Sequence, residues 1–505
     1  PDRFQGIFSR QRLRAIVASI RKSLVLSLAE KYSGILIAIA GTVILSRLLS
    51  PAQIGIYSVA AAFVGLAHIV RDFGIGSYLV QERDLTADRI RTAVSVTMLM
   101  AWSIAAVLAV LSGPIAAFYG KPLLRQVVLV LSLTFLLLPL NSPVLSLLRR
   151  DMNFSALFKI HLASNLAHFT IAIGLAWQGF GVMSLAWASV AGMVVTLFVT
   201  LFYRPDWRFW LPSFKEVRHV ASFGFQASVA GIVAELGMSA KDLIIGRMLG
   251  FAPVGLFSRA QGVMFLFHRD IMDAIRGVAF PALAAKTRVG SDLRAFYLRA
   301  MTYVTGLAWP FYALLALMAF PVVRIMFGDQ WDAAIPLVRI LALAGAIGTM
   351  FSLSGSLLMA RGNVGAILRL EIVIQVSRVI LLVLASLYSL EAVAWSVCAT
   401  YLIAGLANNW MLRRLIALPM RDLFRALVPS VVVTGFSVIA PVLTVLFLDV
   451  KGEDMILPLA LASVGAGLGW LFAVHVTNHP IKGELQDLWA RLVPAVRTLR
   501  LGAGK

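Results

Sequence analysis

The sequence predicts an all-α integral membrane protein of about 14 transmembrane helices, in which two six-helix lobes related as parallel repeats are followed by two C-terminal helices. Of its 505 residues, 60% are hydrophobic and only 14% are charged, and the mean hydropathy is +0.87. A soluble domain carries about 25% charged residues, because its surface needs polar cover. Few segments alternate between apolar and polar residues, so the spans are predicted to be helices rather than strands of a barrel.

The basic residues lie between the apolar runs rather than in one patch. The net charge is +21, but this distribution is typical of topology determinants and argues against nucleic acid as a partner. Residues 8–22 repeat apolar side chains at helical spacing in a basic segment, which predicts an amphipathic helix on the cytoplasmic membrane surface. A frayed basic tail is the alternative. The single cysteine, Cys398, allows no disulfide within the chain.

Runs of about 20 mostly apolar residues, the length of a membrane-spanning helix, occur about fourteen times. Twelve are centred near residues 37, 62, 103, 137, 167, 192, 229, 263, 310, 346, 379 and 403, and two near 437 and 465. With a cytoplasmic N-terminus, roughly 31 Lys and Arg fall inside and about 8 outside, which predicts that both termini are cytoplasmic. The expected divisions are a basic segment, an N-lobe, a C-lobe, the last two helices and a cytoplasmic tail: 1–23, 24–215, 216–415, 416–480 and 481–505.

Two stretches, ILSRLLSPAQIGIYS at 44–58 and IIGRMLGFAPVGLFS at 244–258, resemble each other at an offset of 200. Later pairs drift to 210, as between Asn153 and Asn363. Each repeat holds an even number of spans, so the two repeats are predicted to be parallel, with a cavity between them. Arg47 and Arg247 occupy equivalent places near the outer end of the first helix of each repeat. They either snorkel to the headgroups or contact an anionic substrate or the gate between the lobes.

Polar side chains form a stripe at positions i, i+4 and i+7 on two predicted helices. The fifth and eleventh spans carry the stripes, 210 residues apart: His161, Asn165 and His168, then Glu371, Gln375 and Arg378. Ionisable residues in a membrane usually face the protein interior, so both stripes are predicted to line the cavity between the lobes. Alternatively, each bonds to neighbouring helices of its own lobe. A metal site at His161 and His168 is disfavoured because no third ligand is evident, and no cofactor is expected.

Four more ionisable residues fall inside predicted spans: Glu30 and Lys31 in the first, Glu235 in the seventh and Arg259 in the eighth. A carboxylate at this depth is a candidate for binding a coupling H+ or Na+ ion, and Glu30, Glu235 and Glu371 are the candidates for that role. The alternative for each is a structural pair with a neighbouring helix.

These motifs resemble the polysaccharide transporter branch of the multidrug/oligosaccharidyl-lipid/polysaccharide flippase superfamily. In that branch, an Arg-Leu-Leu-x-Pro-x-x-x-Gly-x-Tyr pattern links the first two helices, and here it runs from Arg47 to Tyr57. A pattern like Asp-x-x-Ile-Gly-Arg-x-Leu-Gly opens the second half, and here it runs from Asp242 to Gly250, followed by VAFPAL at 278–283. The resemblance covers almost the whole chain, including two helices after the twelve-helix core. The motifs do not identify the glycan.

The resemblance implies a flippase in the bacterial inner membrane. It would move a polyprenyl-diphosphate-linked oligosaccharide to the outer face by alternating access, for lipopolysaccharide O-antigen, capsule or exopolysaccharide, alongside a polymerase and a chain-length regulator. The prenyl tail would stay in membrane lipid. Arginine suits a diphosphate through its planar fork of donors, so the first candidates for it are Arg378, Arg259 and Lys31. The candidates for sugar hydroxyls or the diphosphate are Asn165, Gln375, His161 and His168.

Three other classes compete with this interpretation. A cation-coupled multidrug or metabolite antiporter of the related efflux branch would use acidic cavity residues, which Glu30, Glu235 and Glu371 could supply. A lipid II flippase is a neighbouring substrate class. A membrane glycan polymerase or ligase would usually need a large outer loop, and the sequence has neither catalytic triad spacing nor a phosphate-cradling loop. The chain is therefore not expected to be an enzyme.

Overall fold

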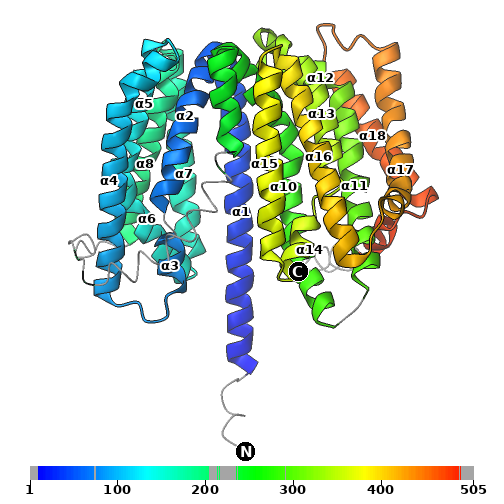
Figure 1. Ribbon diagram of the computed structural model, residues 1–505, viewed down its shortest axis with the longest axis horizontal. Coiled ribbons are helices and arrows are strands. Elements are labelled where there is room, and N and C mark those ends of the chain that lie inside the picture. The colour runs from blue at the N-terminus through cyan, green and yellow to red at the C-terminus, as the bar shows by residue number, and fades with distance from the viewer. Residues whose placement is uncertain are drawn as a thin grey trace, which may run out of the picture. The chain divides into compact units, whose positions relative to one another are not determined.

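The computed structural model describes residues 10–72, 75–203, 213, 215, 235, 237–289, 292–487 and 490. Contacts within the chain divide it into two units, Pro1–Gly255 and Leu256–Lys505. All regular secondary structure in the described ranges is helical (Figure 1), which confirms the all-α prediction. The expected lobe boundary at 215/216 adjoins residues outside those ranges and stays a prediction.

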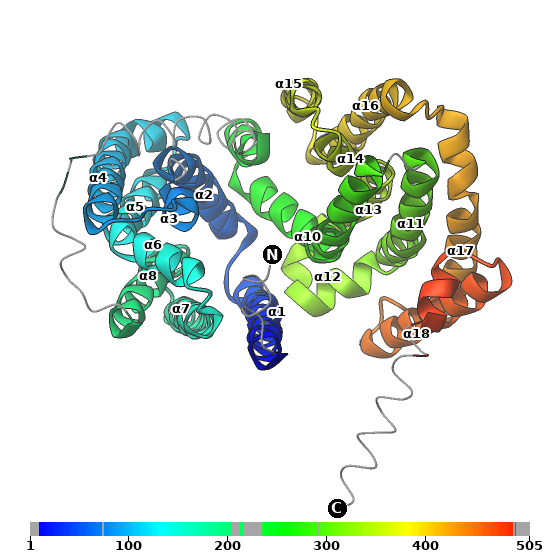
Figure 2. The same cartoon turned by 90° about the horizontal axis from the view of Figure 1, so that it is seen from below.

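The first unit contains helices that run largely side by side, with these bounds: α1 (Arg10–Leu48), α2 (Pro51–Asp72), α3 (Ile75–Gln81), α4 (Ala87–Phe118), α5 (Pro122–Ser132), α6 (Thr134–Arg150), α7 (Phe154–Trp177) and α8 (Met183–Tyr203). Residues 237–248 of this unit are also helical. α1 packs along α7, α7 along α8, and α4 along α5 and α6. Figure 2 views this unit along its helices, where α4 lies beside α5 and α7 lies beside α8.

The helix predicted for residues 8–22 is present from Arg10 onward but is not a separate segment. α1 runs without a break for 39 residues, from Arg10 into the first spanning helix. At about 1.5 Å per residue it is roughly 58 Å long, almost twice the thickness of the hydrocarbon core. In Figure 1 its N-terminal part extends beyond the other helices of the first unit.

The second unit continues α10 (Phe251–Arg288), whose first five residues belong to the first unit. Its other elements are α11 (Leu293–Leu317), α12 (Ala319–Phe327), the 3₁₀ helix η2 (Asp329–Ala334), α13 (Ile335–Thr349), α14 (Ser354–Ala360), α15 (Val364–Ser386), α16 (Leu390–Ile416), α17 (Met420–Phe447) and α18 (Ile456–Val476). Within it α15 packs on α16, α11 on α13 and α17, and α17 on α18.

Eleven segments in the described ranges are long and apolar enough to span a membrane, and they coincide with eleven of the predicted spans. The predicted spans near residues 263 and 379 lie in α10 and α15. Polar side chains interrupt the apolar sequence of both helices, and α15 contains three ionisable residues. The run near residue 229 lies outside the described ranges. The chain is therefore a multi-pass membrane protein, while the count of 14 spans stays a prediction.

The internal repeat is visible in the local backbone of each unit. α7 and α15 both begin at an asparagine cap, because Oδ1 of Asn153 and of Asn363 accepts a hydrogen bond from the backbone N–H three residues on, at 3.1 Å and 3.3 Å. The residue before each cap is left-handed, with φ of 56° at Met152 and 69° at Gly362. Buried clusters beside the caps repeat at the same offset of 210: Leu148, Ala156 and Ile160 in the first unit, and Leu358, Ala366 and Leu370 in the second.

The two similar stretches meet through two glycines within the first unit. Gly55 in α2 lies against the backbone carbonyl of Phe251, and Gly255 in α10 lies against that of Pro51. Phe251 and Gly255 stand 200 residues after Pro51 and Gly55, so the contact is reciprocal. A Cβ atom at either glycine would overlap the facing carbonyl oxygen. Glycine is therefore required for the close approach of these two helix starts.

His479 is buried beside α11 and α17, just beyond the end of α18. Its Nδ1 accepts a hydrogen bond from the backbone N–H of Ile481 at 3.3 Å, and its Nε2 lies 3.3 Å from Oγ of Ser430. Gly306 makes room for the ring, since a Cβ there would lie 2.7 Å from the ring carbon Cε1. Burial lowers the pKa of His479 because desolvation disfavours the charged imidazolium.

Acidification is expected to destabilise this part of the second unit. The unfolded chain takes up a proton near pH 6.5, whereas folded His479 does so only at lower pH. Above about pH 6.5 the free energy of unfolding is unaffected. As the pH falls further it decreases by up to about 1.4 kcal/mol per pH unit, until the pKa of His479 in the folded protein is reached. Thermal unfolding between about pH 7.5 and about pH 5 checks this. His479→Gln should lose less stability over that interval than the wild type, and equal losses would contradict the argument.

Candidate functional site

Each unit contains an open cavity lined by its own helices. The first cavity has a volume of about 670 Å³ and lies among α2, α3, α6, α7 and α8. The second has a volume of about 680 Å³ and lies among α10, α13, α14, α15 and α16. Cavities of this size accommodate a small ligand or one part of a larger one.

The predicted stripe of α7 faces the first cavity. His161, Asn165 and His168 all line it, together with Arg71 of α2 and Arg149 of α6. Among the described residues of this lining, none is a carboxylate and none is Phe, Tyr or Trp. The lining presents guanidinium, imidazole, amide and hydroxyl groups, which suit an anionic or hydroxyl-rich ligand.

Glu30 bonds to one residue of this stripe. Its carboxylate Oε1 lies 2.5 Å from Nδ1 of His161, which makes an ion pair when the imidazole is protonated. Small residues of α1 permit the approach, because Gly34 faces the amide of Asn165 and Gly41 faces the ring of Phe169. The structure therefore joins a candidate for ion coupling to a candidate for substrate binding.

The stripe of α15 faces the second cavity through Glu371 and Arg378. Gln375 links the two along the helix: its Nε2 donates to Oε2 of Glu371 at 3.4 Å, and its Oε1 accepts from Nη1 of Arg378 at 2.9 Å. Arg276 and Tyr401 complete this polar wall. Each stripe thus lines a cavity of its own unit, while the expected cavity between the lobes stays a prediction.

Sequence reasoning missed several lining residues. Charge counting treats Arg149 and Arg276 only as topology determinants, and hydropathy hides Tyr401 inside an apolar span. The internal repeat does not mark Arg276 and Tyr401 from the sequence alone, because their counterparts are a glycine and a methionine. Arg276 stands 200 residues after Gly76, and Tyr401 stands 208 residues after Met193, and both of these earlier residues line the first cavity.

Lys31, Arg47 and Arg247 line neither cavity. All three side chains are exposed, and the guanidinium of Arg247 lies over the ring of Phe118, 4.8 Å from its centre. Arg47 is in the last turn of α1, a place from which a long basic side chain reaches the headgroups. A role of these three residues in substrate binding stays a prediction.

Arg259 and Glu235 also lie away from both cavities. The guanidinium of Arg259 is 6.0 Å from the ring centre of Phe327 and 5.8 Å from that of Trp331, a cation–π arrangement. Its Nε is enclosed and has no hydrogen-bond partner among the described residues. Glu235 accepts a hydrogen bond from Ser239 at 2.8 Å. Their roles in diphosphate binding and ion coupling likewise stay predictions.

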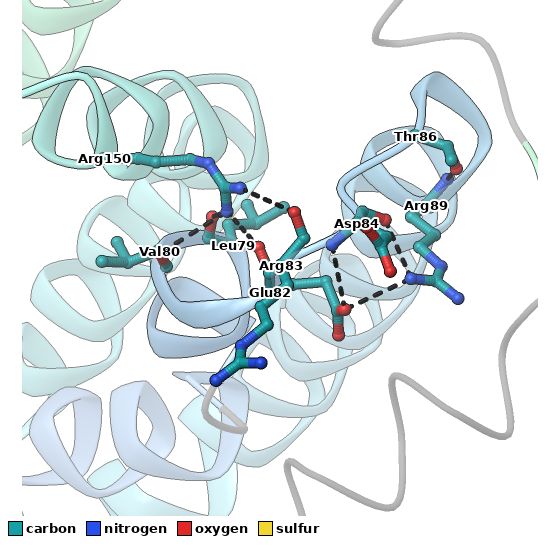
Figure 3. Close-up of polar contacts among 8 residues, drawn as sticks. All are labelled: Leu79, Val80, Glu82, Arg83, Asp84, Thr86, Arg89 and Arg150. Atoms are coloured by element: carbon teal, nitrogen blue, oxygen red, sulfur yellow. Dashed lines mark hydrogen bonds and ion pairs between the residues drawn. The ribbon is translucent and has the colours of Figure 1, made fainter. Parts of the chain in front are cut away.

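Arg150, the neighbour of Arg149, fixes the end of α3. Its guanidinium donates to the backbone carbonyls of Leu79 at 3.1 Å, Glu82 at 2.5 Å and Arg83 at 3.4 Å (Figure 3). Carbonyls at a helix C-terminus lack partners within the helix, and the helix dipole favours a cation there. Because α3 also lines the first cavity, Arg150 holds one of the cavity walls.

Arg150→Ala is expected to lower the free energy of unfolding by about 1–3 kcal/mol, because several carbonyls lose their donor. Arg150→Lys should recover only part of this, since one ammonium group cannot replace the guanidinium fork. The control is Arg125→Ala, which removes an exposed arginine of α5 and should cost less than about 0.5 kcal/mol. Thermal unfolding of the purified variants measures the effect, and equal losses for Arg150→Ala and the control would contradict it.

Comparisons with known proteins agree with this architecture. The family model described as "Polysaccharide biosynthesis protein" matches residues 44–336, more than half of the chain. The teichuronic acid biosynthesis protein TuaB of Bacillus subtilis is 26% identical over 391 residues, which cover 74% of this chain and 78% of that protein. The succinoglycan biosynthesis transport protein ExoT of Rhizobium meliloti is 28% identical over 318 residues, which cover 61% of this chain and 62% of that protein.

Among solved structures, the lipid II flippase MurJ in an inward closed conformation has a similar fold. The TM-score is 0.73 at 12% identity, over 90% of this chain and 98% of that one. The likeness confirms the expected flippase-type fold, and the family match covers both similar stretches at 44–58 and 244–258. Fold, repeat and family model lead to one conclusion: this chain belongs to the polysaccharide biosynthesis protein family.

Proposed function

We propose that this chain is a flippase that moves a polyprenyl-diphosphate-linked oligosaccharide repeat unit from the cytoplasmic to the outer face of the bacterial inner membrane by alternating access. The observation that carries the proposal is the first cavity, which gathers Arg71, Arg149, His161 and His168 among membrane-spanning helices. The transported unit enters the synthesis of a surface polysaccharide: lipopolysaccharide O-antigen, capsule or exopolysaccharide.

The polar lining of the first cavity can replace the water that the headgroup of this cargo would lose in the membrane. A diphosphate-sugar headgroup cannot enter about 30 Å of hydrocarbon unaided, because it would lose its hydration without compensation. Guanidinium, imidazole, amide and hydroxyl groups replace that water, while the prenyl tail remains in lipid. The family description, "Polysaccharide biosynthesis protein", supports a glycan cargo, and the relative ExoT is named a succinoglycan biosynthesis transport protein.

A coupling ion, H+ or Na+, supplies the energy in this proposal. Glu30, Glu235 and Glu371 are the candidate carboxylates, and each has a polar neighbour. Glu30 is the strongest of the three, because its partner His161 also lines the first cavity. Protonation or cation binding at Glu30 would alter the charge that the cavity offers to its cargo.

The orientation proposed here has both termini in the cytoplasm, because the basic segments then lie inside. The protein acts as a transporter rather than an enzyme: its product leaves at the outer face unchanged in covalent structure. A polymerase and a chain-length regulator are the proposed partners that use the product.

Depletion of this protein in its native host tests the proposal. We expect one oligosaccharide diphosphate lipid to accumulate on the cytoplasmic face while surface polysaccharide is lost. Extraction of lipid-linked glycans, with sidedness determined by a membrane-impermeant reagent, measures both. Accumulation of lipid II would point to that substrate instead. Unchanged lipid-linked glycans together with new sensitivity to cationic compounds would replace the flippase with an efflux transporter.

A further inference from the structure

We infer that the two cavities divide the cargo between them: the cavity of the first unit binds the diphosphate, and the cavity of the second unit binds sugar rings. The inference rests on the proposed flippase function and extends it by assigning each part of the cargo to its own site. It depends on a comparison of the two linings across the internal repeat.

The two cavities are equivalent sites of that repeat. Several lining positions correspond at an offset of 210, among them Ser142 with Ser352, Ser146 with Ser356, and His168 with Arg378. Equivalent helices therefore build both cavities, so a difference between the linings is a substitution at a shared position. Such substitutions show what each cavity has become suited to bind.

Aromatic rings distinguish the second cavity. Phe351 stands where the first cavity has Asn141, and Tyr401 stands where it has Met193, at offsets of 210 and 208. The face of an aromatic ring is flat, apolar and electron-rich. The C–H-covered face of a pyranose packs well on such a ring, whereas a diphosphate has no apolar face to place there.

Two glycines make room for these rings. A Cβ on Gly405 would lie 2.9 Å from the ring of Phe351, and a Cβ on Gly348 would lie 3.0 Å from the ring of Tyr401. The counterparts of both glycines in the first unit are leucines: Leu197 and Leu138. Where the second unit has a ring in place of a smaller side chain, it also has a glycine in place of a neighbouring leucine. The space left by the leucine accommodates the ring within the cavity wall.

The polar groups of the second cavity suit hydroxyl groups. Asn408 and Glu371 line it, and Oγ of Ser354 donates to Oδ1 of Asn408 at 2.6 Å. Carboxylate and amide oxygens accept from sugar hydroxyls, which a diphosphate cannot offer. The same carboxylate, Glu371, offsets the positive charges of Arg276 and Arg378 and would repel a diphosphate.

Two arginines line each cavity, but the first has neither an aromatic ring nor a carboxylate among its described lining residues. Arg71 and Arg149 line the first cavity with two histidines. The counterpart of Arg149 in the second cavity is Met359, so this cation belongs to the first cavity alone. Guanidinium groups bind phosphate oxygens through short charge-assisted hydrogen bonds. Glu30, which bonds to His161 from α1, is the one carboxylate that an anion would meet there in a described contact.

The test exchanges residues between the repeats in the purified full-length protein in lipid nanodiscs. Arg149→Met and Tyr401→Met each install the counterpart from the other unit. The probes are inorganic diphosphate and the neutral oligosaccharides released by mild acid from the lipid-linked glycans of the host, titrated calorimetrically. Arg149→Met should weaken diphosphate binding about tenfold or more and oligosaccharide binding less than about twofold. Tyr401→Met should weaken oligosaccharide binding about fivefold or more and diphosphate binding less than about twofold, while Tyr401→Phe keeps both.

Each outcome separates this inference from the proposed function. If the wild type binds both probes but one variant weakens both equally, or the pattern is reversed, the division of the cargo is overturned and the flippase proposal stands. If the wild type binds neither probe, the division of the cargo is overturned, and the depletion experiment alone decides the flippase proposal. Thermal unfolding verifies each variant. If Tyr401→Met does not fold, Phe351→Asn makes the same exchange at the other ring position and should weaken oligosaccharide binding alone.

Discussion

Replacing Gly55 with alanine is expected to abolish the accumulation of folded protein, and Gly255→Ala is expected to do the same. In each variant the new methyl group would overlap a backbone carbonyl of the facing helix start, Phe251 or Pro51. A carbonyl cannot rotate away as a side chain can, so one helix start would have to shift. Such a shift costs roughly 3 kcal/mol or more, which outweighs the gain of about 1 kcal/mol that alanine brings to a helix.

The matched controls are alanine substitutions at helical glycines in open space. At Gly262 in α10 and Gly113 in α4, no described heavy atom from beyond the local helix backbone lies within 4 Å of the position a Cβ would take. Gly262→Ala and Gly113→Ala should keep or slightly raise the stability. Size-exclusion chromatography of detergent-solubilised fluorescent fusions measures the folded fraction. Equal yields from Gly55→Ala and Gly262→Ala would show that the reciprocal contact is not needed.

Arg378→Ala is expected to lower transport about tenfold or more while membrane insertion and folding remain intact. The guanidinium lines the second cavity and is positioned by its hydrogen bond to Gln375 at 2.9 Å. Hydrogen bonds from a charged group to a ligand are worth about 1.5–3 kcal/mol, which corresponds to about 10- to 150-fold in binding. The measurement is restoration of surface polysaccharide in the depleted host at matched protein levels.

Arg369→Ala is the matched control for this prediction. Arg369 lies on the same helix, α15, but its side chain is exposed, donates to the carbonyl of Gly365 at 3.3 Å and does not line the cavity. Its removal should leave transport near the wild-type level. Wild-type transport by a well-expressed Arg378→Ala would mean that the α15 stripe does not contact the cargo.

Helix content and span positions could be predicted from the sequence because they depend on local composition. Eleven spans fall where hydropathy places them, since an apolar run of about 20 residues has the length and composition of a membrane-spanning helix. The stripe of His161, Asn165 and His168 also needed only helical periodicity, which brings positions i, i+4 and i+7 to one face. The resemblance of the two stretches near residues 44 and 244 indicated the repeat, but not the reciprocal glycine contact.

Contacts between distant or adjacent residues could not be predicted in the same way. Glu30 and His161 are 131 residues apart, and their bond depends on how α1 packs against α7. Arg149 and Arg150 are chemically identical neighbours, yet one lines a cavity and the other holds the end of α3. A count of charges cannot separate the two, because neighbouring positions on a helix point about 100° apart. Only the packing of α3 against α6 decides their roles.

When His161 is protonated, its bond to Glu30 gives the first cavity a counter-ion of its own. An anion that binds His161 displaces a carboxylate already there, so its net binding free energy is the difference between two similar contacts. A carrier benefits from this near balance, because cargo held too tightly would never be released. When the anion leaves, Glu30 recovers its partner, and the imidazole need not regain a full shell of water.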